Sequence, residues 1–295
     1  MLKSQVISLE RNRAKIRSES TRAQSRLKFK LMNLQNIEAE IDFFDNKFFK
    51  FTRISENGTR IFDLHLKYTQ KYLDNGLMVL DIGCNDGRHT LFLRDKGYKA
   101  FGLDLSRKAI KRSQDKFFAF GEHLQGEGMK HFICANAYNI PIKTEKFDVV
   151  LLLETLHHIS EKEKVLKNIK EILKPRGKII ISEPNPDNIL RPFGKYFGKK
   201  FSFISPNETL TPTDETLKAI SKHFEIKKFF FYLTPIPILL VFIYEILINL
   251  TGTRSKLMEN ILSILYRLEN ITTENNTIGR RAMWRLMIIG EKTDR

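Results

Sequence analysis

The segment best suited to bind a ligand is a short apolar run that ends in an acid and turns through glycines. It reads MVLDI at 78–82 and GCNDG at 83–87. Glycine is needed where a backbone bends sharply or a ligand approaches closely. A dinucleotide-binding fingerprint would place glycines at 83, 85 and 88, and only Gly83 fits it. Because Asp81 and Asp86 would repel a pyrophosphate, the loop suits a ligand that carries ammonium and sulfonium groups.

A second acid, Asp104, ends the next apolar run, 23 residues after Asp81 (104 − 81). This spacing corresponds to one unit of strand, turn, helix and strand. An ionised carboxylate can accept two hydrogen bonds from a vicinal diol, which makes Asp104 a candidate ligand for a ribose. The alternative role for Asp104 is to cap the next helix, which Ser106 could also do.

Two histidines, His157 and His158, follow an apolar run at 147–153. At the carboxyl edge of a sheet, a histidine could remove a proton from an acceptor hydroxyl or an acidic carbon. The alternative is that a histidine there only packs or bonds the backbone, and the sequence leaves open which of the two would be the base. The spacing of the remaining residues shows neither a serine-histidine-acid triad nor a metal-ligand cluster.

Strands and helices are expected to alternate around these residues. Runs such as VVLLL at 149–153 and III at 179–181 are typical of strands buried on both faces. The pattern predicts an α/β fold with a doubly wound, mostly parallel seven-stranded sheet. The predicted strands cover 78–82, 98–103, 131–134, 147–153, 178–182, 224–233 and 282–289, and the predicted helices cover 88–96, 106–123, 161–173 and 213–222, the last with Thr213 as its N-cap.

Four motifs in this order resemble the class I S-adenosylmethionine-dependent methyltransferases, specifically the type 11 group that includes small-molecule enzymes of quinone pathways. The motifs are DIGCNDG at 81–87, GLDLS at 102–106, FD at 147–148 through LHHI at 156–159, and LKPRGK at 173–178. The resemblance covers 78–183 well and 205–290 loosely. It implies a Rossmann-like methyltransferase fold and S-adenosylmethionine as the cofactor.

The same resemblance implies roles for individual residues in cofactor binding. Gly83 and Cys84 would contact the methionine end through their backbone, Asp81 would order its ammonium group, and Asp104 would take both ribose hydroxyls. The full set implied for the cofactor is Asp81, Gly83, Cys84, Gly87, Asp104, Leu105, Asn136, Ala137 and Leu153, and the candidate catalytic residues are His157 and His158.

Two positions depart from the family pattern. Asn85 stands where the family usually has glycine, and asparagine tolerates the left-handed region better than most residues. Asn136 stands where the family usually has an acid that holds the adenine amino group. An amide oxygen can still accept that hydrogen bond, so Asn136 and the Ala137 backbone remain candidates beside a purely structural role.

Composition sets further bounds on the 295-residue chain. Its net charge of +16 favours an anionic partner, and its two cysteines exclude a disulfide framework and a cysteine-rich zinc site. Residues 1–30 lack the apolar core of a signal peptide, which predicts a cytoplasmic protein. The expected organisation is a basic arm at 1–33, a helical cap at 34–75, a methyltransferase domain at 76–233 and 281–292, and an apolar helical insertion at 234–280.

The insertion is unusually apolar for a surface segment. Pro235 and Pro237 are expected to interrupt it and to leave 237–250, which at 14 residues (250 − 237 + 1) is shorter than the roughly 20 needed to cross a bilayer. The segment from Leu257 to Leu268 has helical periodicity and could be its amphipathic partner. We therefore expect peripheral attachment to an anionic membrane, on its inner face, with a homodimer interface and ordinary core covering as alternatives.

These features together predict a methyltransferase that acts on a small, lipophilic or membrane-associated acceptor. The positive charge also suggests RNA methylation, but the chain shows no RNA-binding module, which makes a nucleic acid partner the weaker alternative. A non-catalytic binding protein that retains the cofactor fold is a third hypothesis. The identity of the acceptor and of the methylated atom does not follow from the sequence.

Overall fold

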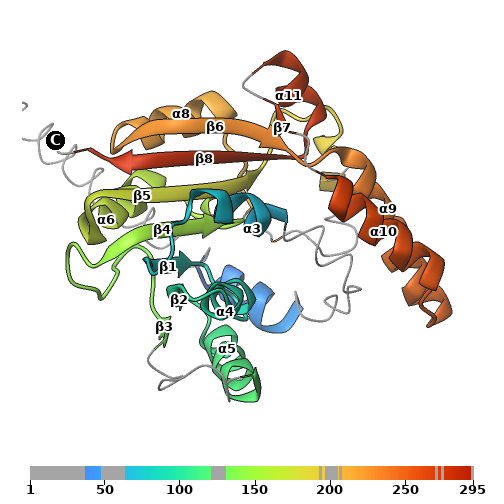
Figure 1. The fold of residues 1–295 in the computed structure, drawn as a ribbon, viewed down its shortest axis with the longest axis horizontal. Coiled ribbons are helices and arrows are strands. Elements are labelled where there is room, and N and C mark those ends of the chain that lie inside the picture. Colours follow the sequence, from blue (N-terminus) through green and yellow to red (C-terminus); the bar gives the residue numbers. More distant parts are fainter. Residues whose placement is uncertain are drawn as a thin grey trace, which may run out of the picture.

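A computed structural model of the chain describes residues 37–47, 64–120, 131–192, 195–196, 205, 208–269, 272–273 and 276–293. Helices cover both faces of one mixed sheet (Figure 1). The predicted basic arm at 1–33 lies outside the described residues, as does part of the predicted cap.

The sheet has the strand order β3-β2-β1-β4-β5-β8-β6-β7. Strands β1 to β5 run parallel, and β8 lies antiparallel between β5 and β6. Strand order runs outward in opposite directions from β1 and β4, so the topological switch point lies between these two strands. The strands are β1 (Met78–Ile82), β2 (Lys99–Asp104), β3 (Phe132–Cys134), β4 (Phe147–Leu153), β5 (Leu173–Pro184), β6 (Phe224–Tyr232), β7 (Thr272–Thr273) and β8 (Arg285–Lys292).

The doubly wound, mostly parallel architecture predicted from the sequence is confirmed. The expected seven strands form, and β7 adds a two-residue pairing at the edge beyond β6. Strand β5 begins at Leu173, before the predicted 178, because Leu173 pairs with Phe147 across an irregularity in the register.

The helices flank the strands in the predicted order. They are η1 (Phe43–Lys47), which ends the helical segment 37–47, α3 (Leu64–Thr69), η3 (Gln70–Tyr72), α4 (Arg88–Asp95), α5 (Arg107–Phe120), η5 (Leu156–His158), α6 (Lys162–Ile172), α8 (Thr213–Ser221), α9 (Pro235–Thr251), α10 (Lys256–Leu268) and α11 (Thr277–Ala282).

Two local expectations were wrong. Thr213 is not the N-cap of α8: Pro212 holds that position, and its carbonyl accepts the first helical bond from the Thr216 N–H. Pro235 and Pro237 do not interrupt the apolar helix. They lie in the first turn of α9, where a missing N–H costs nothing, so the helix runs for 17 residues.

Alternating side chains of the strands form the two larger hydrophobic clusters of the described residues, one on each face of the sheet. Val79 and Leu151 point to the face covered by α3, α4, α9 and α10, while Leu80 and Val150 point to the face covered by α6 and α8. The α9–α10 hairpin extends past the end of the sheet (Figure 1). Of the helices that the structure describes, none is long and apolar enough to cross a membrane.

Candidate functional site

The loop between β1 and α4 turns through three residues in the left-handed region. Gly83 has φ +79°, Asn85 has φ +49° and Gly87 has φ +75°. A Cβ at Gly83 would clash with the side chain of Thr155, and one at Gly87 would lie 2.7 Å from the Cβ of Ser113. Glycine is therefore required at both ends of the loop, and asparagine keeps the turn at the position where the family usually has glycine.

The two residues predicted to touch the methionine end have inward-facing amides. The N–H groups of Gly83 and Cys84 both donate to the Leu103 carbonyl, over 2.7 and 3.1 Å. The Cys84 side chain is buried and packs over Gly102, where a Cβ would clash with its sulfur. Burial raises the pKa of the Cys84 thiol. A ligand contact from this segment would therefore use carbonyl oxygens rather than N–H groups.

Asp81 is almost fully buried and faces α4. Its Oδ2 accepts a hydrogen bond of 2.9 Å from the Thr90 hydroxyl, and burial raises its pKa. The carboxyl thus ties β1 to α4, and its effect on a bound ammonium group would be electrostatic. Asp86, the other acid of the loop, is paired with Lys116.

Asp104, the residue predicted to bind a ribose, lies at the carboxyl end of β2. It ends β2 beside the glycine loop, and its Oδ2 accepts from the Asn85 N–H and its Oδ1 from the Ser106 N–H, each over 2.8 Å. Burial raises the pKa of Asp104, while these two N–H donors oppose that effect. Each oxygen retains a second lone pair for a ribose hydroxyl. The prediction that Ser106 caps the next helix is confirmed, because its Oγ accepts from the Ala109 N–H over 2.9 Å.

The remaining predicted cofactor residues line the same edge of the sheet. Asn136 follows β3, and its Oδ1 accepts from the Tyr138 N–H over 2.9 Å, which shapes the turn. Contact with an adenine amino group would use the second lone pair of that oxygen. The Ala137 carbonyl accepts from Asn168. Leu105 directly follows β2, and Leu153 ends β4 and is buried.

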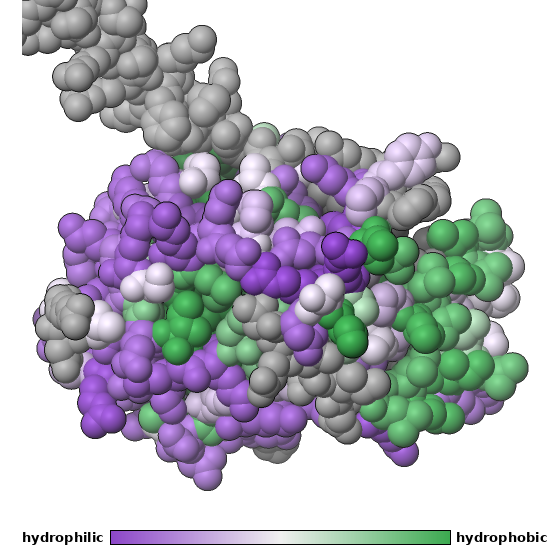
Figure 2. Space-filling view, turned by 90° about the horizontal axis from the view of Figure 1, so that it is seen from above, coloured by the Kyte–Doolittle hydropathy of each residue, from purple (hydrophilic) through white to green (hydrophobic). Residues whose placement is uncertain are grey.

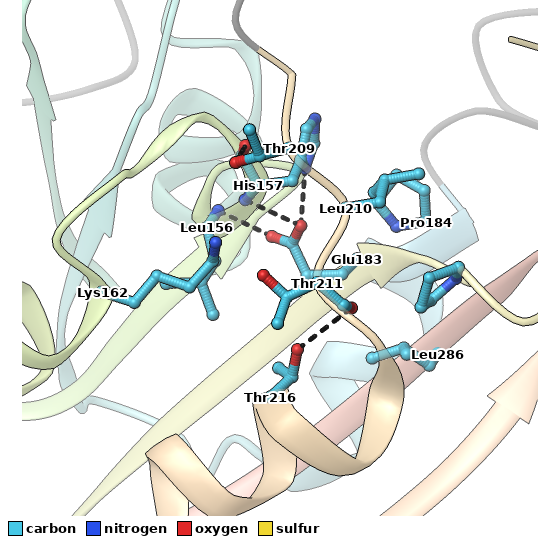
Figure 3. Close-up of a pocket in the computed structure, with 11 residues that line it drawn as sticks. Leu156, His157, Lys162, Glu183, Pro184, Thr209, Leu210, Thr211, Thr216 and Leu286 are labelled. Atoms are coloured by element: carbon cyan, nitrogen blue, oxygen red, sulfur yellow. Dashed lines mark hydrogen bonds and ion pairs between the residues drawn. The ribbon is translucent and has the colours of Figure 1, made fainter. Parts of the chain in front are cut away.

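His157 lies on the turn η5 and contacts a buried acid at the end of β5. Its Nδ1 lies 2.5 Å from the Oε2 of Glu183 (Figure 3). Burial lowers the pKa of His157 to about 3 and raises that of Glu183 to about 7. A pKa this low keeps the imidazole neutral at pH 7.

His158 has different neighbours, although the two imidazole centroids are only 4.0 Å apart. Its Nδ1 lies 3.1 Å from the Oε2 of Glu40 and 3.2 Å from the Oγ of Ser205. Burial alone would lower the pKa of His158, but the contact with Glu40 outweighs it and raises the pKa. The pKa values of the two neighbouring histidines are thus shifted in opposite directions.

The segment 37–47 covers this part of the sheet edge. Glu40 reaches His158, the ring of Phe44 packs edge-on against the His158 ring at 5.3 Å, and Asp45 accepts a hydrogen bond from Ser106. One short segment thus bridges the loop that follows Asp104 and the turn after β4.

A second buried polar cluster joins four elements behind the site. Arg285 on β8 pairs with Glu154 over 3.3 Å, and its Nη1 lies 2.7 Å from the Nδ1 of His65. His65 and His89 are joined through their Nε2 atoms over 3.3 Å. Because arginine only donates, His65 accepts at Nδ1, carries its proton on Nε2 and donates to His89. The network holds α3 against α4 and β8.

Sequence reasoning missed Glu40, Glu183 and this network. Glu183 had a usable signal, because it is an acid at the end of a buried strand on the same edge as His157. Arg285 and His65 are 220 positions apart, and nothing in their local sequence predicts the pairing. Among the described residues, no group of three or more His, Cys, Asp or Glu side chains could hold a metal ion.

Comparisons with known proteins indicate a methyltransferase domain within the chain. Residues 80–181 match the family model described as a methyltransferase domain. The mitochondrial ubiquinone biosynthesis O-methyltransferase of Homo sapiens is 27% identical over 150 residues, which cover 49% of this chain and 40% of that protein. The O-methyltransferase resE of Aspergillus sclerotiorum is 27% identical over 124 residues, covering 39% and 46%. The chain thus spans less than half the length of these curated relatives.

Solved structures show the same fold. A S-adenosylmethionine-dependent methyltransferase of Thermotoga maritima, described as a possible histamine N-methyltransferase, superposes with a TM-score of 0.60 at 20% identity and covers 85% of this chain and 98% of that one. The geranyl diphosphate C-methyltransferase of Streptomyces coelicolor, solved with S-adenosylhomocysteine, gives 0.52 at 12% identity, covering 78% and 79%. Residues 80–181 thus match a methyltransferase domain, and the chain has the fold of S-adenosylmethionine-dependent methyltransferases.

Proposed function

We propose that the protein transfers a methyl group from S-adenosylmethionine to a small lipophilic acceptor. The observation that carries the cofactor assignment is the junction of the glycine loop with Asp104 at the carboxyl edge of the sheet, beside the switch point. At this junction a Cβ at Gly83 or Gly87 would clash with neighbouring side chains. The Asp104 carboxylate there is available to bind the ribose of the cofactor. S-adenosylmethionine would supply an activated methyl group, and much of the rate enhancement would come from placing the acceptor in line with it.

The lipophilic acceptor is supported by the surface of the α9–α10 hairpin. The hairpin is anchored by the buried side chains of Val241, Tyr244 and Leu262, and its outer face is apolar (Figure 2, right). Its exposed apolar side chains are Ile236, Leu239, Ile243, Ile246, Leu247, Leu250, Leu257, Ile264 and Leu268. Soluble monomers rarely expose a contiguous apolar surface of this kind without a partner.

We assign an anionic membrane surface as the partner of this hairpin. Arg254 and Lys256 are exposed at its turn, next to Leu250 and Leu257, which are 78% and 71% exposed. The acid Glu269, in contrast, is buried and bonded to Thr234. Burial of each large apolar side chain contributes about 1.5–3 kcal/mol at best, and each nearby cation about 1 kcal/mol, which suffices for reversible attachment. An enzyme held there would meet acceptors dissolved in the bilayer.

Vesicle sedimentation tests the membrane assignment. The wild type should sediment with anionic vesicles, more weakly in high salt and more weakly with neutral vesicles. The double variant Leu239→Ser/Leu250→Ser should stay in the supernatant. The control Phe118→Ser/Ile189→Ser removes side chains of similar exposure, 62% and 66%, outside the hairpin and should sediment normally. If the wild type sediments with neither vesicle type and is dimeric without lipid, the hairpin is instead a homodimer interface.

The acceptor class is tested by incubating the protein and a cell extract with methyl-labelled S-adenosylmethionine and then separating lipid, RNA and water-soluble small-molecule fractions. We expect label in the lipid fraction. Label in RNA or in the water-soluble fraction would overturn the lipophilic acceptor while leaving methyl transfer intact. No label in any fraction, together with unimpaired cofactor binding, would favour a non-catalytic role.

A further inference from the structure

The carboxyl group of Glu183 is enclosed by the turn that carries His157 (Figure 3). Its Oε1 accepts from the N–H groups of Thr155 at 3.1 Å and Leu156 at 2.7 Å. Its Oε2 accepts from the His157 N–H at 3.1 Å and lies 2.5 Å from the Nδ1 of the same residue. Glu183 and His157 are only 5% and 6% exposed, so water does not compete for these contacts.

We infer that Glu183 is a positioning residue that holds the His157 imidazole with its proton on Nδ1 and its lone pair on Nε2, ready to act as the base of methyl transfer. Burial raises the pKa of Glu183 to about 7, while the three backbone N–H groups that donate to its carboxylate oppose this shift and favour the ionised form. An ionised carboxylate only accepts, so the short contact requires a proton on Nδ1. A neutral imidazole has one N–H, which leaves the lone pair on Nε2.

The inference rests on the proposed function and specifies its proton transfer. The acceptor hydroxyl or acidic carbon loses its proton to Nε2 of His157, while the electron pair left behind forms the bond to the methyl carbon. The bond between that carbon and the sulfonium breaks, and its electrons return to sulfur. The products are the methylated acceptor, S-adenosylhomocysteine and an imidazolium ion, whose charge the Glu183 carboxylate offsets.

The surroundings separate His157 from His158 in this role. His158 faces Glu40 and Ser205 rather than Glu183, and the contact with Glu40 raises its pKa. His157, which faces Glu183, is kept neutral by burial. The other charged groups that act on His157 are His158, Glu154, Glu208 and Arg191. Of these, Arg191 is paired with Glu208 over 2.8 Å, and Glu154 with Arg285 over 3.3 Å.

The tautomer can be measured without any turnover. In ¹⁵N-labelled wild-type protein, long-range ¹H–¹⁵N correlation spectra at pH 7.5 should show His157 protonated on Nδ1. In Glu183→Gln the amide oxygen should face the Thr155 and Leu156 N–H groups, which turns the amide nitrogen towards Nδ1 and moves the imidazole proton to Nε2. A wild-type His157 protonated on Nε2 would overturn the inference, whether or not methyl transfer is ever detected.

Kinetics supply the second readout. Glu183→Gln should lower the rate of label transfer at saturating S-adenosylmethionine by about 100-fold or more, with cofactor affinity within about twofold of wild type. The matched control is Asp148→Asn, a carboxyl at the start of β4 that also accepts from a backbone N–H, that of Met78. Its rate should be close to wild type. Normal turnover in Glu183→Gln would contradict the inference, whereas absence of cofactor binding in the wild type would contradict the proposed function instead.

Discussion

Two glycines with positive φ, Gly83 and Gly97, differ in how much room surrounds their Cα atoms. Gly83 and Gly97 both have φ near +80°, but a Cβ at Gly83 would clash with Thr155, while one at Gly97 would meet nothing within 4 Å. Backbone strain is therefore common to both positions, and steric conflict belongs to Gly83 alone. This difference makes Gly97 a matched control for the loop.

We predict that Gly97→Ala destabilises the protein by about 1–2 kcal/mol, the cost of the left-handed region for a residue with a Cβ. Gly83→Ala should cost about 1–3 kcal/mol more, because it also overpacks the contact with Thr155. Urea denaturation of both variants measures the difference. Equal losses of stability in the two variants would mean that the Thr155 side chain moves aside without cost. The loop would then not need glycine at position 83 to pack against Thr155.

At this scale, local chemistry predicted some roles and missed others. The Ser106 cap followed from its position before a helix, and the position of Asp104 at the end of β2 followed from the apolar run before it. Cys84 proved to be a packed core residue with its amide turned inward. The bond between His157 and Glu183 joins the turn η5 to the end of β5, and no local periodicity in the sequence reveals such a contact.

Helices and strands were the most predictable features, because apolar periodicity decides which face an element can bury. The boundaries that moved did so for reasons outside that pattern. Strand β5 starts early because β4 offers it a pairing partner, and α9 starts at Pro235 because proline suits a first helical turn. Pairing between strands depends on tertiary contacts, and a helix start depends on local backbone stereochemistry. The spacing of apolar residues in the sequence reports neither.

The way α11 is fastened also depends on long-range contacts. Asn185, fully buried after β5, donates its side-chain amide to the carbonyls of Arg280 and Met283, each over 2.8 Å. These carbonyls lie at the end of the helix, where intrahelical partners run out. Asn188 adds a second bond of 2.8 Å to the Met283 carbonyl. The asparagine-rich turn thus serves as a cap for a helix nearly a hundred residues away.

We predict that Asn185→Ala destabilises the protein by about 1–3 kcal/mol, because it leaves the partly buried Arg280 carbonyl without that donor. The exposed Asn139→Ala is the control and should change stability by less than about 0.5 kcal/mol. Thermal or urea unfolding of both variants compares them. If Asn185→Ala loses no more stability than Asn139→Ala, α11 is held by its apolar contacts alone.

At the scale of the whole molecule, two distinct parts carry the proposed function. The sheet edge gathers the glycine loop, Asp104 and the histidine turn, and the α9–α10 hairpin presents an apolar face beside exposed cations. The net charge of +16 fits an anionic surface but does not by itself distinguish lipid from nucleic acid. The sequence could predict the apolar insertion, whereas its form as a hairpin with one anchored and one exposed face required the three-dimensional structure.

The most direct test of the account is calorimetric titration of S-adenosylmethionine into the wild type and into Asp104→Ala. The wild type should bind one equivalent, and Asp104→Ala should bind more weakly by about 1.5–3 kcal/mol, because it loses charge-assisted hydrogen bonds to the ribose. The control Asp95→Ala removes an exposed acid of α4 and should bind as the wild type does. Absence of binding to the wild type, or equal affinity of the wild type and Asp104→Ala, would contradict the assignment of this sheet edge as the cofactor site.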